Sequence, residues 1–366
     1  MTDRDTLRRM RAMVAVVLSM AGCVSASATP LAPRGPGDSA PETAHQDKVA
    51  LASTPQLKVS PTEPTSSAPA PVGSAPASPP AATLVTIADK GAAKVQLLNA
   101  GAEPRTVLRY VFHQGESIPF RIRTDMEMDT IVSVSGLSSS QAPRSMHQIL
   151  PTTECTGITN TKRVDADGTA HRNGSLFGMN VLARQGVLPA VQTKMEEMLR
   201  GVGNIAFDDV IDARGQISDS HMDLSAVREP TMLESMQQMA DGMSALTMPW
   251  PAEPVGVGAK WQVLSNYGKG KSYARDMIVS LVSMKGKKLK LETTSSVTGT
   301  PSTVVKNGAT VELKATGSTG TGKLDVSLDP LLMHSTSTTR TKTESSTNGV
   351  AIQMDLEIVT EFHSGP

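Results

Sequence analysis

Two kinds of side chain alternate along Ile122-Arg123-Thr124-Asp125-Met126-Glu127-Met128-Asp129-Thr130-Ile131-Val132-Ser133-Val134. The even-numbered positions carry Ile, Thr, Met or Val, whereas the odd-numbered positions from 121 to 129 carry Arg, Asp or Glu. A period of two places successive side chains on opposite faces of an extended backbone. The run therefore predicts a long β-strand with one buried face and one solvated face.

The C-terminal run repeats this pattern. Every second position from Val350 to Phe362 is apolar or Thr, and most positions between them are polar. Asn348-Gly349, just before it, favours a two-residue hairpin turn. Further turns are expected at 167–168, 213–215 and 285–287, and further strands near 259–283, 288–297, 308–316, 323–329 and 332–345.

These patterns predict a mainly β (α+β) fold: a large antiparallel meander or half-barrel with one amphipathic helix packed on it. The helix is expected near 226–247, where apolar residues recur every three or four positions and Pro249 follows. A shorter helix is expected near 188–199. Stretches opening at Leu108 and Trp261 each begin a two-strand passage, so a duplicated β unit is one version of this prediction.

The longer predicted helix carries a stripe of methionines: Met232, Met236, Met239 and Met243. One interpretation is core packing of the helix on the sheet. The other is an adaptable apolar groove, because methionine is flexible and polarizable and suits surfaces that accept varied partners. A curved sheet with a helix on its concave face resembles periplasmic lipoprotein carriers that hold acyl chains.

The N-terminus has the proportions of an export signal. Four arginines precede the apolar run 13–20, which is too short to span a bilayer, and Met20-Ala21-Gly22-Cys23 follows. This run resembles a bacterial lipoprotein signal. The resemblance implies cleavage after residue 22, lipidation of Cys23 with acyl chains such as palmitate, and attachment to the cell envelope. Val24 follows the cysteine, which resembles lipoproteins sorted to the outer membrane, facing the periplasm or the surface.

Residues 23–82 are rich in Pro, Ala, Ser and Thr and contain no aromatic residue. Such a composition buries too little apolar surface to offset the entropy of ordering. We expect a lipid-anchored disordered tether, followed by one β-rich domain over 83–366.

Two motifs inside that domain resemble entry points of strands. Pro254-Val255-Gly256-Val257-Gly258-Ala259-Lys260-Trp261 has the form Pro-Val-x-x-Gly-x-x-Trp, and Leu108 to Glu116 resembles an opening strand. Both are similar to segments of poorly characterised bacterial envelope lipoproteins. That family supplies no catalytic residues to transfer.

Two loop-like motifs suggest ligands but depart from the required pattern. Residues 317–323 match G-x-x-x-x-G-K, yet Leu324 stands where a phosphate loop needs Ser or Thr, and the residues that follow alternate like a strand. We expect a hairpin loop there. Asp165-Ala166-Asp167-Gly168 resembles the start of a calcium loop, but the twelfth position is Leu176, so a hairpin turn is expected.

The remaining chemistry-bearing residues form no recognisable catalytic pattern. The seven histidines have no close metal spacing, and Asp208, Asp209 and Asp212 are interpreted as solvated strand-end charges. Cys155 is expected to be a small buried residue without an activating neighbour. No catalytic, cofactor or metal site is predicted, and the protein is not expected to be an enzyme.

Composition narrows the function further. Lys+Arg and Asp+Glu are both 35, and no long basic stretch offers phosphates a binding surface, so nucleic acid is not an expected partner. Aromatic residues make up 3%, which argues against a glycan-binding platform. The main hypothesis is a membrane-anchored envelope lipoprotein that binds an apolar ligand or an envelope protein without catalysis. The alternatives are a structural lipoprotein without a pocket and a hydrolase without recognisable motifs.

Overall fold

A computed structural model describes the part of the chain that carries the β-rich fold. The described residues are 84–88, 93–134, 143–200, 202–225, 227, 248–267, 273–306, 309–347 and 350–365. Cys23, the tether, the Asn348-Gly349 turn and, except for Val227, the helix predicted near 226–247 lie outside these ranges.

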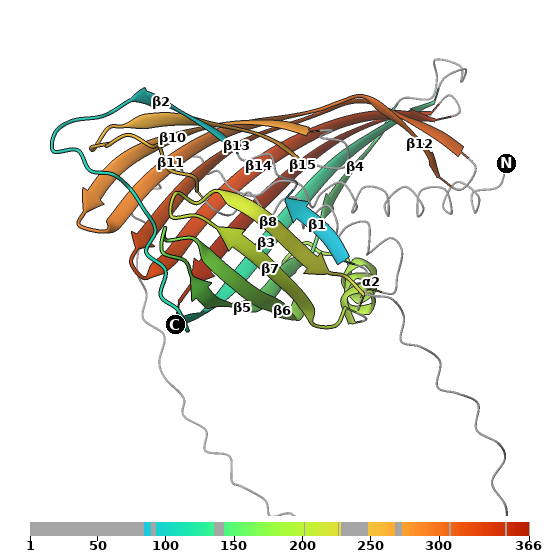
Figure 1. Cartoon of the computed structure of the whole chain (residues 1–366). Helices are drawn as coiled ribbons and strands as arrows, with labels where there is room; N and C mark the ends of the chain where they lie inside the picture. The colour runs from blue at the N-terminus through green and yellow to red at the C-terminus, as the bar shows by residue number, and fades with distance from the viewer. Residues whose placement is uncertain are drawn as a thin grey trace, which may run out of the picture. The chain divides into compact units, whose positions relative to one another are not determined.

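One antiparallel sheet of 15 strands dominates the described residues (Figure 1). The first group is β1 (Leu84–Ala88), β2 (Lys94–Asn99), β3 (Ser117–Val134), β4 (Arg144–Ile149), β5 (Thr152–Val164), β6 (Ala170–Leu182), β7 (Ile205–Ile211) and β8 (Ile217–Asp223). The second group is β9 (Lys260–Tyr267), β10 (Tyr273–Lys285), β11 (Lys288–Gly299), β12 (Ser302–Lys306), β13 (Ala309–Leu328), β14 (Leu331–Thr347) and β15 (Val350–Ser364).

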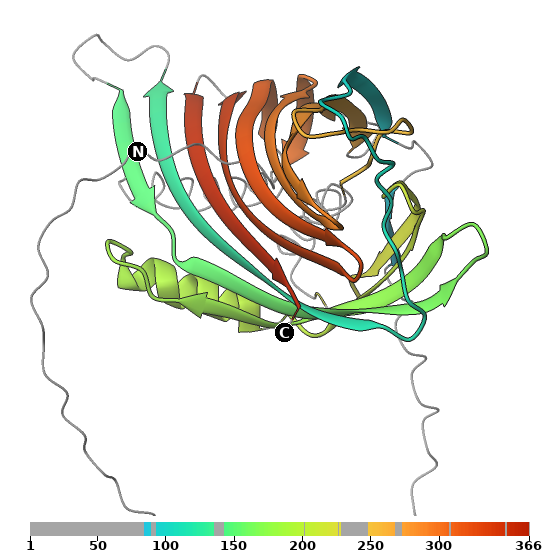
Figure 2. The same cartoon turned by 90° about the vertical axis from the view of Figure 1, so that its left-hand side faces the viewer.

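The sheet consists of two meanders joined at β3 and β15. The strand order is β1-β8-β7-β6-β5-β3-β15-β14-β13-β11-β10-β9-β2, with β4 paired to β3 and β12 paired to β13. This order confirms the predicted large meander, which is open rather than closed and curves strongly (Figure 2). The two meanders differ in strand number, and their duplication stays a prediction.

The two outermost strands are consecutive in the chain. β1 pairs with β8 at one edge of the sheet, and β2 pairs with β9 at the other. Because few residues separate Ala88 from Lys94, an extended chain can span only about 20 Å between them. The two edges therefore lie near each other, and each is formed by a short strand from the N-terminal side.

The alternation read from the sequence is the alternation of burial in the structure. On β3, Met128 and Thr130 are buried while Asp129 is exposed. On β15, Met354, Leu356, Ile358 and Thr360 are buried. β3 and β15 pair along their length, with Met128 opposite Leu356, so the two strongest sequence patterns lie side by side on one face.

The prediction of a hairpin loop at 317–323 is wrong. These residues lie inside β13, which runs without a break from Ala309 to Leu328 between β11 and β14. Ser318 is buried and bonds to Thr341 of β14 at 2.9 Å. Pairing on both sides overrides the local turn signal of the glycines.

The prediction of a strand that begins at Leu108 is also wrong. This segment is not part of a strand and bonds instead to two separate parts of the sheet. The Tyr110 N–H donates to the Ala213 carbonyl and the Val111 N–H donates to the Leu328 carbonyl, both at 2.8 Å. Tyr110 and Trp250 lie 5.2 Å apart between ring centroids, and Trp250 and Trp261 lie 5.9 Å apart. This aromatic group belongs to the largest core cluster, together with Leu289, Leu291, Leu324 and Val326.

The turn predictions and the shorter helix are confirmed. Gly168, Gly215 and Gly286 have φ values of 86°, 80° and 59°, which a two- or three-residue hairpin turn uses. Helix α2 (Pro189–Arg200) is the one helix among the described residues; it begins with a proline and lies against β6. No helix in the described ranges is long and apolar enough to cross a membrane.

Candidate functional site

The core-facing side of β14 carries a column of hydroxyl groups. Its members, the hydroxyl column, are Ser335, Ser337, Thr339, Thr341 and Thr343. Each is no more than 7% exposed. They share their face with Leu331 and Met333, which pack against the largest core cluster. Serine and threonine side chains are usually exposed to solvent. Five of them buried along one face therefore distinguish this strand from the apolar core beside it.

Small residues of β13 lie opposite this column. Thr341 pairs with Ser318, Thr339 pairs with Gly320, and Ser337 pairs with Gly322. A methyl group at Gly320 would lie 3.1 Å from the Thr339 hydroxyl oxygen, so the backbone of β13 approaches the column closely. At these three pairs, the core-facing side of β13 and β14 is therefore polar, uncharged and low in side-chain volume.

The other flank of the column is apolar. Met128, Met354, Leu356 and Ile358 form a separate core cluster on β3 and β15, with Met126 packed against it. Methionine contacts adapt to irregular neighbours. The hydroxyl column thus borders a methionine-rich surface, and together they could accommodate a molecule with both apolar and hydrogen-bonding parts.

Two buried hydroxyls at the end of this surface have no hydrogen-bond partner within the described part of the chain. They belong to Thr130 on β3 and Thr343 on β14, which are 8% and 3% exposed. Met354 lies between them, since it pairs with Thr130 on one side and Thr343 on the other. A buried hydroxyl without a partner costs about 1–3 kcal/mol. These two groups are therefore able to bind a polar atom brought by a ligand.

One cation lies on the same face of the sheet. Arg275 of β10 is 8% exposed and donates from Nη2 to the Met277 sulfur at 3.2 Å. Arg275 pairs in register with Val297, Val297 pairs with Ser318, and Ser318 pairs with Thr341 of the hydroxyl column. Arg275 therefore lies in the same row across the sheet as Thr341.

The sequence does carry a signal for the hydroxyl column. From 335 to 343 the odd positions are Ser or Thr and the even positions include Arg340 and Lys342. This is the period of two with hydroxyls in place of apolar residues. The site residues that the sequence did nominate, Cys23 and the four methionines Met232, Met236, Met239 and Met243, lie outside the described residues.

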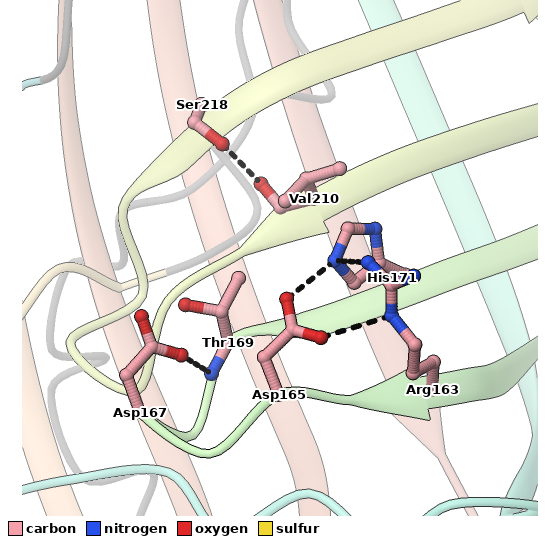
Figure 3. A network of polar contacts seen from close by, with 7 residues as sticks. All are labelled: Arg163, Asp165, Asp167, Thr169, His171, Val210 and Ser218. Atoms are coloured by element: carbon pink, nitrogen blue, oxygen red, sulfur yellow. Dashed lines mark hydrogen bonds and ion pairs between the residues drawn. The ribbon is translucent and has the colours of Figure 1, made fainter.

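A second polar group closes the β5–β6 hairpin (Figure 3). The Asp165 carboxylate lies 2.9 Å from Arg163 Nε and 2.8 Å from His171 Nε2. The hydrogen bond from His171 holds the pKa of Asp165 below its usual range. Asp167 accepts from the Thr169 N–H at 2.9 Å, which confirms a turn rather than a calcium loop. No described hydroxyl or thiol is bonded to His171, so this group orders a turn and offers no nucleophile.

Two of the three aspartates in and after β7 differ from the predicted solvated charges. Asp209 forms a bidentate ion pair with Arg172, at 2.7 and 2.6 Å, and both side chains are nearly buried. Asp212 accepts from the backbone N–H groups of Arg214 and Gln216. Only Asp208 is solvated as expected, 4.0 Å from Lys162.

Cys155 is half-buried beside the second core cluster, which contains Phe120 and Leu176. Burial raises its pKa to about 11, so the reactive thiolate is scarce at neutral pH. In the described ranges, no group of three or more His, Cys, Asp or Glu side chains is arranged to hold a metal ion.

Comparisons with known proteins add little. No family model matches the chain, and no curated protein matches it in sequence. Among solved structures, Ail, the attachment invasion locus protein of Yersinia pestis, is similar over 68% of this chain and 99% of its own, with 7% identity and a TM-score of 0.11. A TM-score this low does not indicate the function of this protein.

Proposed function

We propose that this protein is a lipid-anchored envelope protein that binds an amphipathic, lipid-like ligand on the core-facing side of its sheet, without catalysing a reaction. The anchor is Cys23, and the tether that follows it holds the β-rich domain away from the membrane. Two membrane signals hold a protein firmly, so a diacylated cysteine would be sufficient.

The observation that supports the ligand proposal is the pair of buried hydroxyls that have no partner among the described residues. Thr130 and Thr343 flank Met354, and the methionine-rich cluster lies directly beside the hydroxyl column. An apolar tail would pack against the methionines and aliphatic side chains. Polar atoms near its head would accept or donate hydrogen bonds with the two threonines, which relieves their burial cost.

The four methionines near 226–247 fit the same proposal as an additional apolar surface. Met232, Met236, Met239 and Met243 recur at helical spacing in a segment that joins two buried positions, Val227 and Met248. In this proposal they contact the apolar part of the ligand, because methionine tolerates ligands of varied shape.

The ligand proposal is tested by native mass spectrometry of the full chain, purified gently in detergent. We expect a co-purified lipid in the wild type and reduced retention in Thr343→Val, which keeps the shape of the side chain but removes its hydroxyl. Thr338→Val is the matched control, because Thr338 lies on the same strand with the opposite orientation. Equal retention in the two variants, no lipid in the wild type, or a bound protein in place of a lipid would each reject this function.

The anchor is tested separately. Cys23→Ala should lose both metabolic labelling by palmitate and sedimentation with membranes, since no other residue offers the required thiol at that place. If Cys23→Ala is labelled as strongly as the wild type, the assignment of the anchor is wrong.

A further inference from the structure

Two histidines of the described structure form a pair that none of the others forms. Four of the six described histidines lie beside a carboxylate: His113, His147, His171 and His221. The other two, His334 on β14 and His363 on β15, lie beside each other instead. They are direct partners in the strand register, and both are exposed.

The two Nδ1 atoms lie at hydrogen-bond distance from each other, 3.3 Å, and the rings cross at 71°. The same separation suits two nitrogen ligands of one metal ion. With metal–nitrogen bonds of about 2.05 Å, this separation subtends about 107° at a shared ion, close to the tetrahedral value. Strand pairing holds both side chains on one face, so little side-chain freedom would be lost on binding.

We infer that His334 and His363 chelate a divalent transition-metal ion such as Zn²⁺ or Cu²⁺. Imidazole nitrogen suits these ions, and Cu²⁺ binds most tightly in the usual order of the first-row series. The neighbouring Asp325, which pairs with His334 in register, is occupied by Lys290 at 3.5 Å. The protein therefore supplies two ligands, and water or a second molecule completes the coordination.

This site is independent of the proposed ligand-binding face. The hydroxyl column occupies the odd positions of β14 from 335, whereas His334 lies at an even position and points to the other side. Metal binding would join the start of β14 to the end of β15, two residues from the last described position, and so stabilise the C-terminal strand.

The test is titration of the full chain in detergent, without a polyhistidine tag, with ZnCl₂ and with CuCl₂ by calorimetry. We expect a site of one ion per chain whose affinity falls at least tenfold in His334→Ala and in His363→Ala. His147→Ala is the matched control: His147 is also exposed, but it bonds to Asp129 at 2.9 Å. This control should bind the ion as the wild type does.

A spectroscopic readout distinguishes chelation from a general loss of charge. The Cu²⁺-loaded protein should show coupling to two nitrogens in its electron paramagnetic resonance spectrum, and each single variant should show at most one. Unchanged affinity in the His334→Ala/His363→Ala double variant, or an equal loss in His147→Ala, would overturn the inference.

Discussion

The ion pair between Arg172 and Asp209 gives the sharpest test of how the two parts of the core are held together. Asp209 lies on β7 between Phe207 and Ile211, which belong to different core clusters, and Arg172 lies opposite it on β6. The side chains of Arg172 and Asp209 are 12% and 10% exposed. The guanidinium carbon also lies 5.8 Å from the centre of the Phe112 ring.

Replacing Asp209 by Ala removes one partner and leaves the Arg172 charge nearly buried. Breaking a buried pair in this way costs about 3–5 kcal/mol. For a domain of this size, 1 kcal/mol corresponds to about 2–4 °C, so we expect Tm to fall by about 10 °C. The matched control is Asp208→Ala, since Asp208 is the adjacent residue but is solvated, and its loss should change stability by less than about 0.5 kcal/mol.

Tryptophan fluorescence is a suitable measurement, because Trp250 and Trp261 are fully buried and are the two tryptophans of the chain. Unfolding of the full chain in detergent would be followed by heat and by urea. The double variant Arg172→Met/Asp209→Leu should recover part of the loss, because no charge is left unpaired. Equal losses in Asp208→Ala and Asp209→Ala, or a double variant less stable than Asp209→Ala, would refute this reasoning.

Three further predictions concern single positions. Gly174→Ala should destabilise the fold by about 1–3 kcal/mol, because the added methyl would lie 2.3 Å from a phenylalanine ring. Gly317→Ala should be tolerated, because the nearest atom to its added methyl would be 3.9 Å away. Chemical denaturation of the two variants compares their stabilities. The Cys155 thiol should react slowly with a disulfide reagent at pH 8 until the chain unfolds, since its pKa is about 11; rapid labelling of the folded protein would contradict this. The hydrogen bond to Asp329 raises the pKa of His113 above its usual value. The stabilisation from this bond is therefore complete at low pH and is lost as the pH rises through the pKa of His113 in the folded protein. A nuclear magnetic resonance titration should show the raised midpoint in the wild type and an ordinary midpoint in Asp329→Asn.

The fold class was predictable because it follows from a local pattern. Alternation at 122–134 and 350–362 identifies long strands whatever their partners are, and each strand has the predicted face buried. The turns at Gly168, Gly215 and Gly286 follow equally from local backbone chemistry, because a positive φ favours glycine.

The errors come from positions where partners distant in sequence decide. Residues 317–323 carry every local sign of a loop, yet two neighbouring strands pair with them and make them part of β13. The prediction of a solvated Asp209 is wrong because its partner, Arg172, is 37 residues away in sequence. The alternation of Ile205, Phe207, Asp209 and Ile211 is a local signal that places this aspartate on the buried face.

The candidate sites depend on strand register, which no local pattern supplies. The hydroxyl column is visible as a period of two in β14, but the closeness of Thr343 to Thr130 of β3 appears only when β3, β15 and β14 are aligned. The pairing of His334 with His363 across 29 residues has the same origin.

The position of β1 and β2 at the two edges of the sheet has a consequence for biosynthesis. These strands are among the first parts of the domain to be synthesised, yet Leu84 pairs with Asp223 and Lys94 with Leu264, about 140 and 170 residues later. Such distant pairings close slowly. Until they do, β8 and β9 are left without these partners and can recruit another chain. Crowded synthesis should therefore favour dimers in which the N-terminal strands are exchanged between two copies.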